Sequence, residues 1–280
     1  MREINVADIT QVISELCIEA NYYLDEDVLE SLQKAFIMEE SPIGKNVLQE
    51  LIANAKIAKE EQVPLCQDTG FTVIFIELGQ DVRLVGGDLY DAINKGVREG
   101  YIKGHLRKSI VTDPINRINT KDNTPAVIHL DIVPGDKMKI TLAPKGGGSE
   151  NMSAVKMLKP SEGSKGVVDF VVDTVKKAGS NPCPPIILGV GIGGTFEKVS
   201  FLAKKALLRK LGQPNPNPFY EDMEREIFCK VNKTGIGPQG FGGRITTLAV
   251  HIETYPAHIA TLPVAVNINC HSSRHRCCIL

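Results

Sequence analysis

The order of apolar and polar positions separates a helical N-terminal stretch from a longer stretch in which strand-like and helix-like runs alternate. Across residues 5–61, apolar side chains recur at spacings of three and four residues, which indicates amphipathic helices. One helix is expected over about 26–39. The next should begin after Ser41, because Ser41-Pro42 offers an N-cap followed by proline at the first helical position.

Beyond residue 61, short apolar runs bounded by turn residues are typical of strands. Strands are expected at 72–78, 126–133, 137–142, 186–194, 245–252 and 262–269, and helices at about 88–103, 161–177, 195–208 and 220–231. Pro134-Gly135-Asp136 separates two of these strands and predicts that they form a hairpin. We therefore expect an α+β fold in which a helical block over about 1–61 packs on mixed β-sheets with helices, and residues 1–280 form a single compact domain.

Two glycine-rich segments are candidates for ligand binding. Gly189, Gly191 and Gly194 satisfy the dinucleotide-binding pattern G-x-G-x-x-G between a strand and a helix. That fold needs a second strand about 20 residues later, but residues 213–218 there are rich in proline and cannot form a central strand, so dinucleotide binding is disfavoured. The segment 146–148 is three consecutive glycines, whose N–H groups could bind an anion or could simply form a turn.

Composition excludes several classes of function. The chain is 42% hydrophobic and 23% charged with a formal net charge of -1, so neither nucleic acid nor an acidic membrane surface is an expected partner. Aromatic residues are 5% and tryptophan is absent, which disfavours a stacking surface for single-stranded nucleic acid. There is no apolar run of about 18 residues and no apolar N-terminal segment typical of a signal peptide. A cytoplasmic location is expected.

The chain has seven cysteines, and an odd number argues against a disulfide framework. Cys17 and Cys229 lie within helical patterns and are expected to be core residues. Cys66, Cys183 and Cys270 instead lie at the ends of elements beside polar or turn-forming residues, which makes them candidate metal ligands. Their wide separation makes the pattern weak by itself, but three thiolates without a fourth would leave a metal open to substrate.

Asp68 places a carboxylate two residues after Cys66. If the segment is extended, Cys66 and Asp68 point to the same side of the chain and face one pocket.

Together, the local motifs resemble the class I, iron–sulfur-dependent fumarate hydratases and the related L-tartrate dehydratases. The resemblance covers essentially all 280 residues. Its motifs are Pro-Leu-Cys66-Gln-Asp68-Thr-Gly, Pro-Lys145-Gly-Gly-Gly-Ser-Glu150-Asn, Asn-Pro-Cys183-Pro-Pro, Val-Asn-Ile-Asn-Cys270-His, and the glycine-rich segments at 189–194 and 235–243.

The resemblance implies a catalytic domain with a 4Fe–4S cluster held by Cys66, Cys183 and Cys270. Asp68 matches the acidic substrate-site residue of the family and would be catalytic. The substrate-binding positions would be Asp68, Arg107, which binds a carboxylate, Gly147, which offers backbone donors, and His258. Arg244 and Arg274 are further candidates for contact with an anion.

The same resemblance implies a partner. Fused members of the family carry a second domain with the proposed general base, whereas this chain stops just after Cys270. It is therefore expected to be the alpha subunit of a two-subunit enzyme, with a beta subunit and an α2β2 assembly. The expected reaction is fumarate hydration to L-malate, with L-tartrate dehydration as the alternative. A non-catalytic iron–sulfur scaffold or electron-transfer subunit is a further alternative.

Overall fold

The computed structural model describes residues 2–280, which divide into two compact units. Unit 1 contains residues 2–25, 55–147 and 274–280, and unit 2 contains residues 26–54 and 148–273. Both units combine helices with a mixed sheet, so the α+β prediction is confirmed. That residues 1–280 act as one catalytic domain stays a prediction.

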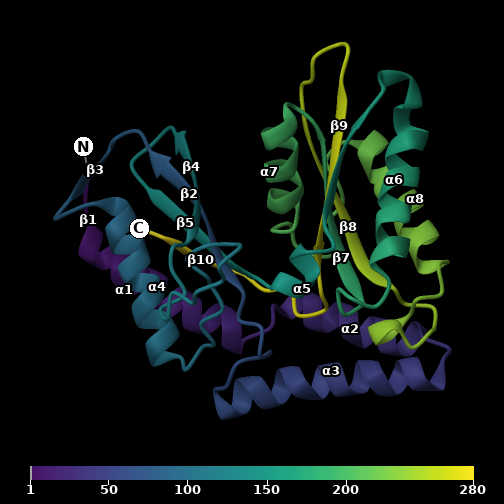
Figure 1. Cartoon of the computed structure of the whole chain (residues 1–280), viewed down its shortest axis with the longest axis horizontal. Coiled ribbons are helices and arrows are strands. Elements are labelled where there is room, and N and C mark those ends of the chain that lie inside the picture. The colour runs from purple at the N-terminus through teal and green to yellow at the C-terminus, as the bar shows by residue number, and fades with distance from the viewer. Residues whose placement is uncertain (1) are drawn as a thin grey trace. The chain divides into compact units, whose positions relative to one another are not determined.

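Unit 1 is built on a four-stranded sheet in the order β10-β5-β2-β4. The strands are β2 (Phe71–Gly79), β4 (Val127–Val133), β5 (Met138–Lys145) and β10 (Arg276–Ile279). Helices α1 (Val6–Tyr22) and α4 (Leu89–Lys103) pack together beside this sheet, and β1 (Arg2–Asn5) pairs in parallel with β3 (Val82–Val85) (Figure 1).

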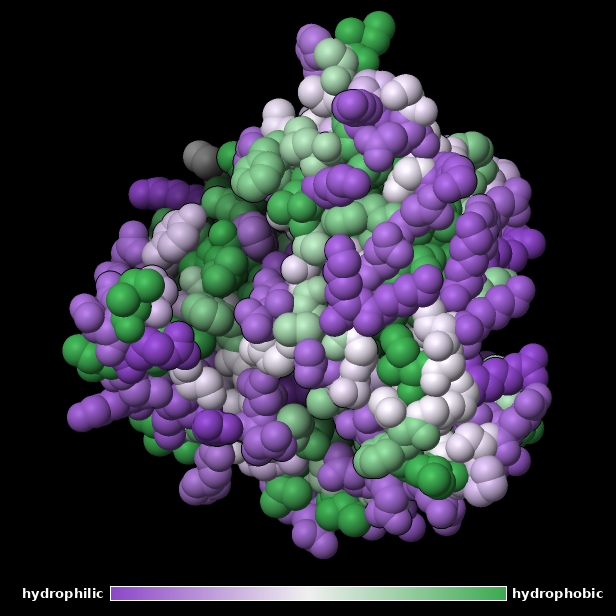
Figure 2. Space-filling model, turned by 45° about the vertical axis from the view of Figure 1, so that its right-hand side comes forward, coloured by the Kyte–Doolittle hydropathy of each residue, from purple (hydrophilic) through white to green (hydrophobic). Residues whose placement is uncertain are grey.

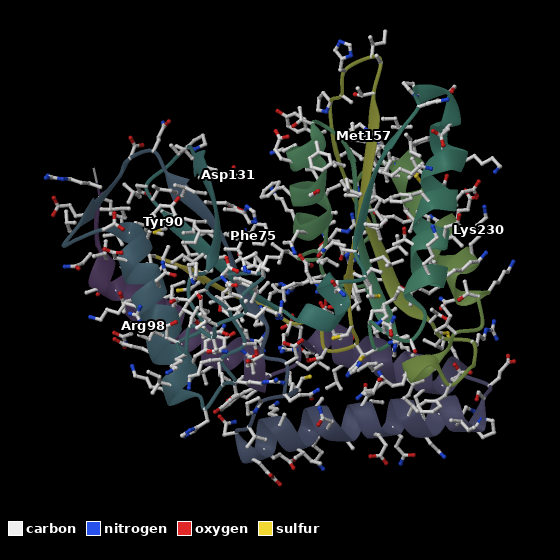
Figure 3. All side chains as sticks on the ribbon, viewed as in Figure 1. Phe75, Tyr90, Arg98, Asp131, Met157 and Lys230 are labelled. Atoms are coloured by element: carbon white, nitrogen blue, oxygen red, sulfur yellow. The ribbon has the colours of Figure 1, made fainter. Side chains whose placement is uncertain are left out.

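The core of unit 1 lies between α1, α4 and one face of the sheet. Ile74 and Ile76 of β2 point into it and are at most 1% exposed. Phe75 points to the opposite face, where its ring lies 5.0 Å from that of His129 and on the same side as Asp131 (Figure 3). This alternation fixes which side chains of β2 meet the helices.

Unit 2 also has a four-stranded sheet, in the order β6-β9-β7-β8. Its elements are α2 (Glu26–Met38), most of α3 (Pro42–Glu61), α5 (Gly147–Glu150) from its second residue on, β6 (Ala154–Leu158), α6 (Gly163–Ala178), β7 (Ile186–Gly193), α7 (Phe196–Ala206), α8 (Pro218–Asn232), β8 (Thr247–Tyr255) and β9 (Leu262–Asn269), with single turns at Pro160–Glu162 and Pro238–Gly240. Helices α6 and α8 cover one face of the sheet and α7 covers the other (Figure 1). All eight residues of β7 are therefore buried.

The two sheets share a topology. In each, a central strand (β2 or β7) is followed by a helical crossover to a parallel neighbour (β4 or β8). The chain then returns to the other side of the central strand as an antiparallel strand (β5 or β9). The start of the central strand thus lies beside the end of the returning strand, with Phe71 opposite Lys145 and Ile187 opposite Asn269.

This topology positions the candidate residues. Cys66 precedes β2 and Cys183 precedes β7, while Cys270 follows β9. Each cysteine therefore lies at the end of its sheet where the central strand begins.

Most predicted helices and strands are present, and Ser41 caps α3 by accepting a hydrogen bond from the Gly44 N–H at 3.2 Å. The predicted hairpin around Pro134-Gly135-Asp136 is wrong. Strands β4 and β5 do not pair with each other but flank β2, whose apolar side chains on both faces suit a central position. The short strands β1, β3, β6 and β10 were not predicted.

The structure differs from the expectations for Cys229 and for the N-terminal helical block. Cys229 is exposed on α8, so its assignment to the core is wrong. The N-terminal helices are divided, with α1 in unit 1 and α2 in unit 2. Hydrophilic side chains cover much of the face in Figure 2, and among residues 2–280 no helix is long and apolar enough to cross a membrane.

Candidate functional site

The segment from Cys66 to Gly70 forms a turn in front of β2. The Asp68 N–H donates to Cys66 Sγ at 3.4 Å, and the Gly70 N–H donates to Asp68 Oδ1 at 3.1 Å. The segment is therefore folded back on itself and is not extended as expected.

The Asp68 carboxylate is held from two sides. Its Oδ2 accepts a hydrogen bond from the Gly147 N–H at 2.8 Å, across 79 residues of sequence. The glycine loop after β5 therefore directs a donor at Asp68. The predicted role of the Gly147 N–H as a substrate donor stays a prediction, and it requires this donor to be shared with the substrate.

Arg107 is joined to the same turn through its backbone. Its carbonyl oxygen accepts a hydrogen bond from Thr69 Oγ1 at 2.7 Å, and its side chain is exposed. Unit 1 therefore brings Cys66, Asp68, Gly147 and the Arg107 segment together at one end of its sheet.

The two further arginine candidates are engaged by protein groups. Arg274 is 5% exposed, and its Nη2 donates to the Asp68 carbonyl oxygen at 2.9 Å and to Asn21 Oδ1 at 3.1 Å. In unit 2, Arg244 Nη1 contacts Glu40 Oε1 at 2.7 Å. Arg274 thus supports the Asp68 turn through its backbone.

In unit 2, the segment around Cys183 contacts the one that follows Cys270. The Cys183 carbonyl oxygen lies 3.5 Å from the His271 backbone nitrogen, which donates to it, and 3.0 Å from His271 Nδ1. Gln239 adds a third segment, because its Nε2 donates to the Pro184 carbonyl oxygen at 2.9 Å and lies 3.1 Å from His271 Nδ1. Hydrogen bonds therefore join the loop that contains Cys183 to the segment that follows Cys270.

His258 lies elsewhere in unit 2. It is exposed in the turn between β8 and β9, where its Nδ1 accepts a hydrogen bond from the Ala260 N–H at 3.2 Å. Cys270 follows the other end of β9, and eight residues of strand span about 25 Å. Unit 2 therefore does not bring His258 to its cysteines, and the substrate role of His258 stays a prediction.

The cysteines differ in their exposure to solvent. Cys17 is fully buried, and burial raises its pKa to about 12, so it stays protonated and inert. Cys66 and Cys270 are partly exposed and Cys183 is exposed, so all three are accessible. Within either unit, the described residues 2–280 include no group of three His, Cys, Asp or Glu side chains arranged for a metal. Cys66 belongs to unit 1, and Cys183 and Cys270 belong to unit 2.

Sequence reasoning missed several polar residues around these loops. Thr69, Asn123 and Tyr101 support the Asp68 turn, and Gln239 and His271 connect the cysteine loops. Gln239 and His271 lie inside the family-like motifs, which was the only sign of their importance. Asn123 stands in an irregular loop that carries no motif.

Comparisons with known proteins agree on one family. The family model described as fumarate hydratase (Fumerase) matches residues 10–278. A Methanocaldococcus jannaschii protein provisionally named L(+)-tartrate dehydratase subunit alpha is 44% identical over 272 residues, covering 95% of each chain. The L(+)-tartrate dehydratase alpha subunits of Escherichia coli O157:H7 and K12 are 34% and 33% identical, covering 96% of this chain and 89% of theirs.

Proposed function

This chain belongs to the class I fumarate hydratase and L-tartrate dehydratase alpha-subunit family, and from this we propose that it is the alpha subunit of an L-tartrate dehydratase. The choice of L-tartrate as substrate is supported by the names of the relatives, which are 33–44% identical over nearly the whole chain. They favour the alternative given above over the expected fumarate hydration. Fumarate hydration is the second candidate, supported by the description of the family model.

The donor set fits an iron–sulfur cluster. Cys66, Cys183 and Cys270 are accessible thiols at the ends of elements, and thiolates are the usual ligands of such clusters. When bound by three thiolates, a 4Fe–4S cluster supplies a Lewis-acidic iron for the substrate hydroxyl. The family's use of such a cluster supports this assignment over a non-catalytic scaffold or an electron-transfer subunit.

Arg107 and Asp68 would orient the substrate. A guanidinium can hold a carboxylate through two parallel hydrogen bonds, and the Arg107 side chain is exposed beside the Asp68 turn. Asp68 would accept the hydrogen of a substrate hydroxyl, since the N–H groups of Gly70 and Gly147 fix its carboxylate. Dehydration removes a proton from one carbon and hydroxide from the next, so it also needs a base. We assign that base to a beta subunit in an α2β2 enzyme.

The test is a comparison of substrates on the anaerobically prepared enzyme of alpha and beta subunits. We expect kcat/KM for L-tartrate to exceed that for fumarate and L-malate. A higher value for fumarate would replace the proposal with the second candidate, and no turnover of any of them would refute both.

Arg107→Ala tests the carboxylate contact in the same assay. We expect KM for L-tartrate to rise about 30-fold, because a charge-assisted hydrogen bond contributes about 1.5–3 kcal/mol. Lys108→Ala removes the neighbouring positive charge and is the matched control. Equal effects of the two substitutions would mean that only the general charge of the loop matters.

A further inference from the structure

A pair of hydrogen-bonded contacts fastens the Arg107 segment to the Asp68 turn. Thr69 follows Asp68, is 1% exposed, and donates through Oγ1 to the Arg107 carbonyl oxygen at 2.7 Å. A buried hydroxyl with a single short contact to a distant segment constrains that segment, because breaking this part-buried contact leaves the carbonyl oxygen without its donor.

Asn123 makes the second contact. Its side chain is fully buried, and its Nδ2 donates to the Gly70 carbonyl oxygen at 3.1 Å. Its Oδ1 accepts the Ser109 N–H at 2.8 Å. Both ends of the amide are therefore used, and they join the residue two positions after Asp68 to the residue two positions after Arg107.

The backbone at Asn123 suits this role. Its φ is 63°, in the left-handed region that asparagine tolerates better than most residues. An amide also donates from one atom and accepts at another, so it can bridge two backbone groups. Position 123 thus combines a conformation and a donor–acceptor pattern that few residues can supply together.

The turn itself cannot easily shift to compensate. Tyr101, 1% exposed, donates from its hydroxyl to the Thr69 carbonyl oxygen at 2.7 Å and lies 3.2 Å from that of Gly70. Helix α4 therefore supports the turn through Tyr101, and the turn holds the Arg107 segment through Thr69.

We propose that Thr69 and Asn123 are positioning residues that set Arg107 against Asp68, so that a dicarboxylate held by Arg107 presents its hydroxyl to the Asp68 carboxylate. This inference rests on the proposed function. It assigns Thr69 and Asn123 no contact with substrate. Their loss should weaken binding of the diacid more than it slows the chemical step, because the Asp68 carboxylate keeps its own donors.

The experiment uses the alpha–beta enzyme with Thr69→Val, which removes the hydroxyl at nearly constant shape. We expect KM for L-tartrate to rise about 10-fold, kcat to change less than threefold, and Thr69→Ser to restore KM. We also expect L-tartrate to change the EPR spectrum of the reconstituted enzyme, with the half-maximal change at about 10-fold higher tartrate in Thr69→Val than in the wild type. Iron content should match the wild type.

Thr10→Val is the matched control, because Thr10 is also buried in unit 1 and its Oγ1 donates to the Ala92 carbonyl oxygen at 3.0 Å, in the contact between α1 and α4. It should leave KM unchanged. An equal rise in KM for Thr10→Val, or no rise for Thr69→Val, would overturn the inference while wild-type turnover still supported the proposed function.

Asn123→Asp gives an independent test. Aspartate tolerates the same φ and can still accept the Ser109 N–H, but its carboxylate faces the Gly70 carbonyl oxygen without a hydrogen to donate. We expect a rise in KM at least as large as that of Thr69→Val. An unchanged KM in a folded enzyme would overturn the role of Asn123.

Discussion

Cys17 and Cys183 carry the same side chain in opposite surroundings. Cys17 is fully buried in α1, and its pKa is raised to about 12 because the thiolate would lose its hydration there. Cys183 is exposed and adopts a φ of 55°, held by hydrogen bonds of the surrounding loops. At the scale of single residues, burial makes Cys17 an inert thiol, whereas the exposed Cys183 is accessible as a candidate ligand.

His251 makes stability depend on pH. It is 2% exposed in β8, and burial, with a smaller contribution from the charge of Arg209, lowers its pKa to about 4. In the unfolded chain, a histidine has a pKa of about 6.5. As pH falls from about 6.5 to 4, the unfolded state therefore binds a proton that the folded state does not. The free energy of unfolding should fall by up to about 3 kcal/mol in that window.

The measurement is the free energy of unfolding from urea titrations between pH 4 and 7. His251→Gln can still donate to the Ala206 carbonyl oxygen, which lies 3.2 Å from His251 Nδ1, but does not titrate. We expect it to flatten the slope. His258→Gln, at an exposed position of the same unit, should keep the wild-type slope. An undiminished slope in His251→Gln would contradict the assignment.

At the scale of elements, the glycines of β7 serve helix packing. A Cβ at Gly189 would lie 2.1 Å from the Ala203 carbonyl oxygen, and one at Gly191 would lie 2.2 Å from that of Val199. Helix α7 therefore packs directly on the backbone of β7. This close approach is a physical reason for the G-x-G pattern that involves no nucleotide.

Gly189→Ala should destabilise unit 2 by about 3 kcal/mol, because α7 must move away from the sheet. The free energy of unfolding in urea measures this change. Gly148→Ala is the control, since its Cβ would lie 3.8 Å from the nearest atom and its φ is not positive. Similar stabilities of the two variants would contradict the packing argument.

The shared topology of the two sheets is a second property at this scale. The returning strands β5 and β9 deliver Gly147 and Cys270 to the end where β2 and β7 begin. In both units, the loops that contain candidate site residues therefore lie at the end of the sheet where the central strand begins. No internal repeat is visible in the sequence.

At the scale of the whole molecule, the proposed function gives the candidate residues the roles of cluster ligands and substrate contacts, but it names no residue of this chain as the base. We therefore expect the chain alone, reconstituted anaerobically, to bind iron and sulfide but to show kcat at least about 100-fold below that of the enzyme with its beta subunit, since general base catalysis contributes about 10²–10⁴-fold. Single-turnover and steady-state rates with L-tartrate measure this. Comparable turnover by the chain alone would place the base within these 280 residues.

Local patterns were sufficient to predict most helices and strands. The periodicity of α1 or α6 is a property of neighbouring residues and can be read directly. The hairpin expectation failed because adjacency along the chain does not reveal that β2 lies between β4 and β5. Cys229 was misassigned because a helical pattern does not show which flank of α8 reaches solvent.

The sequence by itself determined most of the secondary structure, the available donors and acceptors, and, through its motifs, the family. Only the tertiary structure decided which of these groups meet. Asp68 receives the Gly147 N–H, Thr69 holds the Arg107 segment, and His271 reaches the Cys183 carbonyl oxygen. Such contacts depend on strand order and register between distant segments, and a hydrogen bond forms only when those place its two atoms within about 3 Å.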